Sequence, residues 1–137
     1  MIDPTTEFGA RVEKRLLEEQ VIWLTTVSPS GIPQPNPVWF YWDGDTVLIY
    51  SQPDAYKVKN LINNPKVSLN FEGATEQGGD VIILAGEAVM EESVLKIDPA
   101  YEEKYHQAII DFGETSEDLI ASYDVAIRVR IEKVRGF

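Results

Sequence analysis

The sequence predicts an α+β fold in which about six antiparallel strands curl into a closed barrel with helices at its rim. Runs of β-branched and aromatic residues are separated by short turns that contain glycine, a pattern that is typical of hairpins. The chain has only 137 residues, and long strands in so short a chain favour closure, because a barrel leaves no sheet edge exposed. We expect residues 1–137 to form one domain, since no linker or repeat divides them.

The first half of the chain begins with a helical pattern and continues with strands. In residues 6–19, Phe8, Val12 and Leu16 recur every four residues and form one apolar stripe of a helix. Turns that contain glycine follow, and they join neighbouring strands into hairpins. The strands of this half are expected at 21–27, 32–42 and 46–51.

The second half of the chain mixes helices and strands. Asp54 is a good N-cap for a short helix, and Pro65 ends that helix. Gly86 lies inside a long strand, at a bulge or a bend of the barrel. Asp98 and Pro99 begin a further helix that reaches about residue 110. The other expected elements are strands at 66–71, 81–90 and 125–131, a loop at 73–80 and a connection with some helix at 111–124.

Charge and composition exclude several classes of function. The formal net charge is −11, and so acidic a surface repels phosphate backbones and anionic lipid, so we expect no nucleic-acid or membrane partner. The absence of cysteine excludes disulfides, thiolate metal sites and cysteine nucleophiles. With His106 as its single histidine, the chain offers little material for a zinc site or a hydrolase triad, and we expect no metal. Residues 1–10 lack the features of a signal peptide, which favours a cytoplasmic location.

The segment 51–61 contains the strongest candidate for a binding site. Lys57 falls in the first turn of the expected helix, where free N–H groups attract anions but a cation opposes the helix dipole. A cation in this unfavourable place, in an acidic protein, indicates an anionic ligand such as a phosphate. The alternative is that Lys57 is a solvated surface lysine. Ala55, Val58 and Ile62 are expected to form the apolar face of this helix, with Lys57 and Asn60 on the other side. Lys59 projects about 160° away from Lys57, so the two lysines cannot form a simple clamp.

The proline-rich segment 31–40 is a second candidate. Prolines at 33, 35 and 37 remove ladder donors, so this segment cannot be an ordinary central strand. Gln34 and Asn36 should point to the same side, where their amides could bind the polar edge of a heterocycle. An irregular edge strand with exposed amides is the alternative. The aromatic residues at 39–42 are expected in the core or an interface, with stacking on a cofactor as the second interpretation.

Three anchors along the chain resemble one known family. They are the segments 23–27, 31–40 and 56–61, the last followed by Asn64 and Pro65. From about Leu16 to its end, the sequence resembles the pyridoxamine-phosphate-oxidase-like split barrels, particularly the actinobacterial branch that uses the deazaflavin F420. The resemblance implies a six-stranded antiparallel split β-barrel with peripheral helices. It also implies a homodimer with two cofactor sites at the subunit interface.

The resemblance implies a set of site residues as well. Lys57 falls at the position of the family's phosphate-binding lysine, and Lys59 and Asn60 fall at nearby polar contacts. Gln34 and Asn36 match positions that face the flavin-like ring. The implied cofactor-binding residues are Gln34, Asn36, Val38, Ser51, Gln52, Lys57, Lys59 and Asn60.

The implied function is that of an oxidoreductase in which reduced F420 donates a hydride to a small organic substrate, with no catalytic residue assigned. An FMN-dependent oxidoreductase is one alternative, and a carrier of flavin, deazaflavin or haem is another. The sequence departs from the family pattern in two places. Ala55 stands where some relatives have a basic residue, and residues 134–137 lack the ending rich in Trp and Arg of true pyridoxamine-phosphate oxidases. We therefore do not expect that particular substrate.

Overall fold

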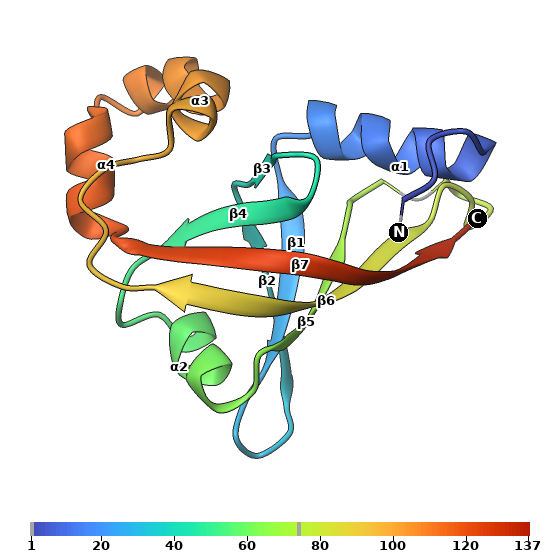
Figure 1. The fold of residues 1–137 in the computed structure, drawn as a ribbon, viewed down its shortest axis with the longest axis horizontal. Coiled ribbons are helices and arrows are strands. Elements are labelled where there is room, and N and C mark those ends of the chain that lie inside the picture. Colours follow the sequence, from blue (N-terminus) through green and yellow to red (C-terminus); the bar gives the residue numbers. More distant parts are fainter. Residues whose placement is uncertain (1, 74) are drawn as a thin grey trace.

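The computed structural model describes residues 2–73 and 75–137. In these residues one sheet of seven strands curls around a core, and four helices lie around it (Figure 1). In chain order the elements are α1 (Glu7–Glu18), β1 (Ile22–Val27), β2 (Pro33–Val38), β3 (Tyr41–Trp42), β4 (Thr46–Ser51), α2 (Tyr56–Asn63), β5 (Lys66–Asn70), β6 (Ile82–Glu91), α3 (Pro99–Asp111), α4 (Ser116–Ser122) and β7 (Val125–Gly136).

The sheet is antiparallel throughout and has the strand order β2-β1-β5-β6-β7-β4-β3. Its two end strands, β2 and β3, are separated in the chain only by Trp39 and Phe40. The three Cα steps from Val38 to Tyr41 span about 11 Å at most, so the sheet has to curl until its ends approach each other. Within the described residues no ladder joins β2 to β3, and the barrel is split there. This arrangement confirms the predicted α+β split barrel.

The structure has seven strands where about six were expected, because the run at 32–42 is divided into β2 and β3. Phe40 leaves the ladder at this point, and side chains of α3 hold its backbone instead. The Tyr105 hydroxyl accepts a hydrogen bond from Phe40 N at 2.7 Å and lies 2.8 Å from Phe40 O. Lys104 Nζ also donates to Phe40 O, at 2.7 Å. Because this corner depends on a helix 60 residues away, the local sequence does not reveal it.

β2 is an edge strand that pairs with β1 alone, which confirms that it is not a central strand. Its prolines at 33, 35 and 37 alternate with Gln34, Asn36 and Val38. Backbone N–H groups of consecutive residues point to opposite edges of a strand, so the ladder to β1 uses the N–H groups of the three non-proline residues. The prolines therefore remove the donors only from the free edge of the sheet.

Two apolar clusters hold the fold together. The larger fills the inside of the curled sheet and includes Val12 and Leu16 of α1, which are fully buried as the helical stripe predicted. The smaller lies between the sheet and α3, and includes Tyr101, Tyr105 and Ile109. Full burial of one large apolar side chain contributes roughly 1.5–3 kcal/mol, so these three residues fix α3 firmly against the sheet.

α1 begins and ends as its sequence predicts, and polar contacts fix its outer face. Thr6 caps the helix, because its Oγ1 accepts a 2.9 Å hydrogen bond from Gly9 N. Arg11 and Arg15 contact the two oxygens of the Asp80 carboxylate at 2.6 and 2.9 Å. Asp80 ends the loop expected at 73–80, of which Ala74 lies outside the described residues.

Gly86 lies at a bulge in β6, as predicted. The register between β6 and β7 shifts between Ala85 and Gly86, so the two strands change their pairing there. A Cβ atom at Gly86 would collide with the carbonyl oxygen of Arg130 on β7. Glycine is therefore required by the close approach of the two backbones.

Two expectations about α2 are wrong. Asp54 does not cap the helix: residues 53 and 54 form a turn, and Ala55 is the N-cap, without a side-chain hydrogen bond. The apolar face was also misassigned, since Ile62 is 70% exposed while Asn60 is buried. The reason is that α2 packs on polar groups of β1 and β2, which hydrophobic periodicity cannot reveal.

The region between β6 and β7 holds both helices of the second half. α3 begins where predicted, with Asp98 as its N-cap and Pro99 in its first turn. The expected mixed connection at 111–124 contains α4, which begins with a capping box formed by Thr115 and Asp118. In the described part of the chain, no helix has the length and apolar character needed to cross a membrane. Nor do the described residues contain a cluster of three or more metal-ligating side chains.

Candidate functional site

Two hollows meet at Lys57, on the side of the molecule where α2 lies against β2. One has a volume of about 580 Å³ and is lined by residues of β2 and by the start of α2. The other, of about 500 Å³, extends from Lys57 toward α3 and α4. Both are lined by Asn36, Ala55 and Lys57, so the two hollows adjoin there, and together they are called the groove. Each volume lies within the range of small-molecule sites, roughly 300–1,000 Å³.

A row of polar contacts joins β2 to α2 along this groove. Lys57 Nζ donates to Asn36 Oδ1 at 3.2 Å. One turn further along α2, Asn60 Nδ2 donates to Gln34 Oε1 at 2.7 Å and to Thr26 Oγ1 at 2.9 Å. The row exists because residues two apart on a strand and three apart on a helix each share a face. The prediction that Gln34 and Asn36 point to the same side is therefore confirmed.

Lys57 is the charged group of the groove. Its side chain is half-buried, and burial lowers the pKa of its ammonium group from the usual value. Among the described residues no carboxylate forms an ion pair with it, and the hydrogen bond it donates goes to a neutral amide. A partly desolvated cation without an anionic partner is costly, and an anion bound in the groove would compensate it.

Lys59 has different surroundings from Lys57. It is exposed, and its ammonium group lies 5.7 Å from the centre of the Tyr56 ring. Tyr56 is itself 75% exposed and lines the rim of the groove. The structure therefore does not bring Lys59 together with the amides of β2. A phosphate contact for Lys59 stays a prediction.

The remaining predicted residues lie at the end of β4 and on β2. Val38 and Gln52 line the hollow that faces α3. Ser51 is fully buried, and its hydroxyl donates to the backbone oxygen of Gln52 at 2.9 Å. It lines neither hollow. Ser51 therefore supports the backbone next to the groove, and a direct contact with a ligand would require its side chain to turn.

An aromatic wall completes the groove, and sequence reasoning missed most of it. Trp39 stacks on Tyr105, with ring centroids 4.5 Å apart and planes 3° from parallel, and Phe112 tilts against Trp39 at 6.0 Å. The aromatic residues that line this hollow are Trp39, Tyr50, Tyr101, Phe112 and Tyr123. Only Trp39 belongs to the aromatic run noted in the sequence. The others come from β4, α3 and the region up to β7, and no local pattern in the sequence marks them as neighbours.

The sequence matches a family model described as pyridoxamine 5'-phosphate oxidase over residues 8–137, which is nearly the whole chain. The chain belongs to this family. A comparison with curated proteins gives no match.

Several solved structures share the fold of this family member. A protein from Listeria innocua described as a putative pyridoxamine 5'-phosphate oxidase is 24% identical, with a TM-score of 0.68 over 92% of this chain and 94% of that one. An F420 reductase is 22% identical, with a TM-score of 0.65 over 89% and 94% of the two chains. HutZ, the haem storage protein of Vibrio cholerae, is 19% identical, with a TM-score of 0.66 over 96% and 95%. At these identities the likeness concerns the fold.

The groove fits a planar cofactor that carries an anionic group. Lys57 offers a positive charge that no described carboxylate neutralises, and the amides of Gln34 and Asn36 offer donors and acceptors. The aromatic wall offers flat apolar surface in the hollow that faces α3, which Asn36 also lines. Polar groups at one end and flat apolar surface at the other are the two features that such a cofactor requires.

Proposed function

We propose that this family member is an oxidoreductase that binds F420 and transfers a hydride between that cofactor and a small organic substrate. The observation that carries the proposal is the half-buried ammonium group of Lys57, which lies in a groove with only a neutral partner among the described residues. The resemblance of the anchors to the F420-using branch supports the choice of cofactor, as does the F420 reductase among the similar folds.

In this proposal each part of the groove has one task. Lys57 binds the cofactor phosphate through a charged hydrogen bond, and Asn36 orients the ammonium group. Gln34, which Asn60 holds in place, directs its amide toward the ring. The aromatic wall excludes water and holds the substrate against the ring. When bound, reduced F420 supplies the hydride itself.

The same features support a second group of candidates. An anion site beside a flat apolar wall also suits the phosphate of FMN or a propionate of haem. The likeness of the fold to a haem storage protein favours a non-catalytic carrier as the alternative to an enzyme. These candidates differ in the ligand that binds and in whether turnover follows.

We also propose that two copies of the chain form a homodimer whose interface completes the groove. The hollow beside β2 is open to the surface, and exposed apolar side chains lie near it. Tyr56 at its rim is 75% exposed, and Ile32, which precedes β2, is 57% exposed. Exposed apolar side chains beside an open hollow support the proposal of an interface there.

The test is a titration of the protein with F420, FMN and haem in parallel. Quenching of F420 fluorescence with the highest affinity among the three would support the proposal. FMN that copurifies in equal molar amount, or that displaces F420, would favour the flavin alternative. Tight binding without turnover across a broad panel of hydride acceptors would identify a carrier instead of an enzyme.

A further inference from the structure

The hollow that faces α3 is enclosed by aromatic rings that are inclined to one another. Tyr50 and Tyr101 meet edge to face, with ring centroids 4.8 Å apart and planes at 89°. Phe112 is tilted by 44° against Trp39, whose ring is stacked on Tyr105. Parallel rings suit a flat ligand, whereas inclined rings surround a rounded group from several sides. This end of the groove therefore fits a rounded group better than a second flat ring.

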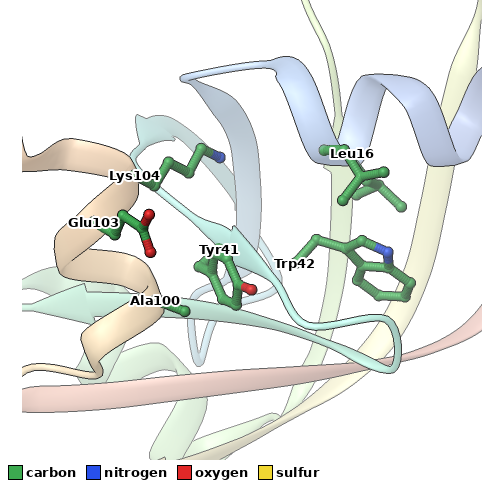
Figure 2. A pocket seen from close by; sticks show the side chains of 7 residues that line it. Leu16, Tyr41, Trp42, Ala100, Glu103 and Lys104 are labelled. Carbon is green, nitrogen blue, oxygen red and sulfur yellow. The ribbon is translucent and has the colours of Figure 1, made fainter.

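No cation of the described residues lies over the rings of the aromatic wall, although the protein uses such contacts elsewhere. The ammonium group of Lys104 lies 3.7 Å from the centre of the Phe40 ring and 5.1 Å from that of Tyr105. Lys104 lines a separate cavity of about 230 Å³ between α1, β3 and α3, and Figure 2 shows its side chain extending from α3 toward α1. The aromatic wall thus keeps its negatively polarised ring faces free for a cation from outside the protein.

One carboxylate lines the same hollow. Glu114 follows α3, and its backbone N–H donates to Ile109 O at 3.1 Å, which fixes its place at the end of that helix. Within the described part of the chain, Glu114 forms no ion pair. The other charged side chain that lines the hollow is Lys57, on α2. The charge of Glu114 is therefore available to a ligand, and the net charge of −11 attracts cations to the molecule.

The Tyr101 hydroxyl has no hydrogen-bond partner among the described residues, although this residue is only 3% exposed. The hydroxyls of Tyr50 and Tyr105, by contrast, are hydrogen-bonded. The described polar atoms that are fully enclosed without a partner are Trp42 Nε1 and Asp124 Oδ1, so the Tyr101 oxygen is not enclosed and reaches the hollow that this residue lines. A buried hydroxyl without a partner requires an explanation, and a polar ligand in the hollow provides one.

We propose that this end of the groove binds a quaternary ammonium group, and that the substrate carries such a group. Its methyl groups, which share the positive charge, contact the ring faces of the aromatic wall, and Glu114 supplies the opposite charge. The free oxygen of Tyr101 faces the same methyl groups. A primary ammonium group is a poorer fit, because it would lose hydrogen bonds to water that ring faces do not replace. The inference rests on the proposed function, since it names the substrate class for the aromatic wall.

Calorimetric titration with choline and with 3,3-dimethylbutan-1-ol tests the proposal. The two molecules have the same shape, but carbon replaces the charged nitrogen in the second. At pH 7 and one low ionic strength, we expect choline to bind about tenfold more tightly or better, because ring faces and Glu114 attract its charge. Equal affinities would show that the hollow is merely apolar and would overturn the proposal, as would the absence of choline binding.

Two variants locate the bound cation. Phe112→Leu keeps an apolar side chain at a position that is 74% exposed but removes the ring, and Glu114→Gln removes the charge. Each should weaken choline binding several-fold and leave 3,3-dimethylbutan-1-ol unchanged. Glu117→Gln is the matched control, since Glu117 is exposed on α4 and does not line the hollow, and it should change choline binding less than Glu114→Gln does. Unchanged choline binding in both Phe112→Leu and Glu114→Gln would place the cation elsewhere and overturn the proposal.

The cofactor titration separates this inference from the proposed function. Lys57→Ala removes the proposed phosphate contact and should leave choline binding unchanged or slightly stronger, because it removes a like charge from the hollow. F420 binding without choline binding would overturn the quaternary ammonium site and leave the proposed cofactor standing. Choline binding without F420 binding would support the site and overturn the proposed cofactor.

Discussion

Lys57 and Lys59 lie two residues apart on α2, yet only one of them faces the groove. Lys57 is half-buried and donates to Asn36, whereas Lys59 is exposed above the ring of Tyr56. α2 begins at Tyr56, so Lys57 lies in its first turn, beside N–H groups that no helical carbonyl accepts. A phosphate bound there would meet both the lysine and the start of the helix.

We expect Lys57→Ala to weaken cofactor binding by about 10- to 150-fold, because a charged hydrogen bond contributes roughly 1.5–3 kcal/mol. Lys59→Ala is the matched control and should lose only a few-fold, through attraction that salt screens. The measurement is the dissociation constant of both variants and wild type at one ionic strength, with the melting temperature of each. Equal losses would mean that both lysines bind the phosphate. No loss for Lys57→Ala would exclude this groove as the phosphate site.

Lys104 makes the stability of the protein depend on pH. The folded chain releases the Lys104 proton near pH 8, whereas the unfolded chain keeps it up to about 10.5. The unfolded state therefore binds more protons between these values, and the free energy of unfolding should rise with pH in this window. Burial also raises the pKa of Tyr101 and Tyr105, but phenols oppose this trend only above about pH 10.

We expect denaturant titrations to show that Lys104 adds about 1 kcal/mol of stability between pH 8 and pH 10, after allowance for its partly exposed side chain. Lys104→Met removes the titrating group, so its free energy of unfolding should rise less over the same range. The comparison of the two slopes cancels the contribution of every other group. Parallel slopes for wild type and variant would contradict the low pKa of Lys104.

At the scale of elements, Asn60 joins α2 to the sheet. Its buried amide donates to Thr26 on β1 and Gln34 on β2, so removal leaves two polar groups without a partner. We expect Asn60→Ala to lower the free energy of unfolding by about 2–3 kcal/mol. Asn63, which is exposed on the same helix, is the control, and Asn63→Ala should change stability by about 0.5 kcal/mol or less. Chemical denaturation measures both, and similar values for the two variants would show that the polar row does not hold α2.

The bulge in β6 gives a second prediction at this scale. Gly86→Ala introduces a Cβ atom against the backbone oxygen of Arg130, and neither strand can move without disturbing the longest ladder of the sheet. We expect a loss of about 2–4 kcal/mol, measured by denaturant titration. Ala85→Gly, one residue earlier, should cost only about 1 kcal/mol, since it adds no contact. A Gly86→Ala variant as stable as wild type would show that the bulge relaxes freely.

At the scale of the whole molecule, the proposed homodimer predicts that cofactor affinity depends on protein concentration. A stable dimer usually buries about 2,000 Å² or more, and we expect sedimentation to show a dimer at micromolar concentration. Tyr56→Asp places a charge at the exposed rim of the groove and should shift the protein toward monomer and weaken cofactor binding together. A monomeric wild type at these concentrations would contradict the proposal.

The parts of this molecule that sequence reasoning found are those with local causes. The stripe of Val12 and Leu16 follows from periodicity and the cap at Asp98 from capping preference, while a glycine inside a strand pattern indicated the bulge at Gly86. The wrong predictions concern positions where contacts with distant residues determine the local structure. Phe40 interrupts its strand because the Tyr105 hydroxyl binds its backbone. Asn60 is buried because its amide donates hydrogen bonds to Thr26 and Gln34.

In the candidate site, too, the residues with a local pattern were predicted and those brought together by distant packing were not. Its β2 and α2 side was identified from alternation on a strand and position on a helix, as Gln34, Asn36 and Lys57 illustrate. The aromatic wall was not, since Phe112 and Tyr123 come from a connection whose sequence reveals only that some of it is helical. Residues that meet only through the packing of α3 and α4 leave no periodic signal.

The prolines of β2 also affect how the protein behaves in concentrated solution. A free sheet edge normally offers both donors and acceptors to a passing strand and so begins aggregation. The free edge of β2 offers acceptors alone, because Pro33, Pro35 and Pro37 occupy each position whose N–H would point outward. Another strand that approaches this edge finds no donors and cannot form a ladder there. A newly made chain can thus expose this edge without starting a fibril.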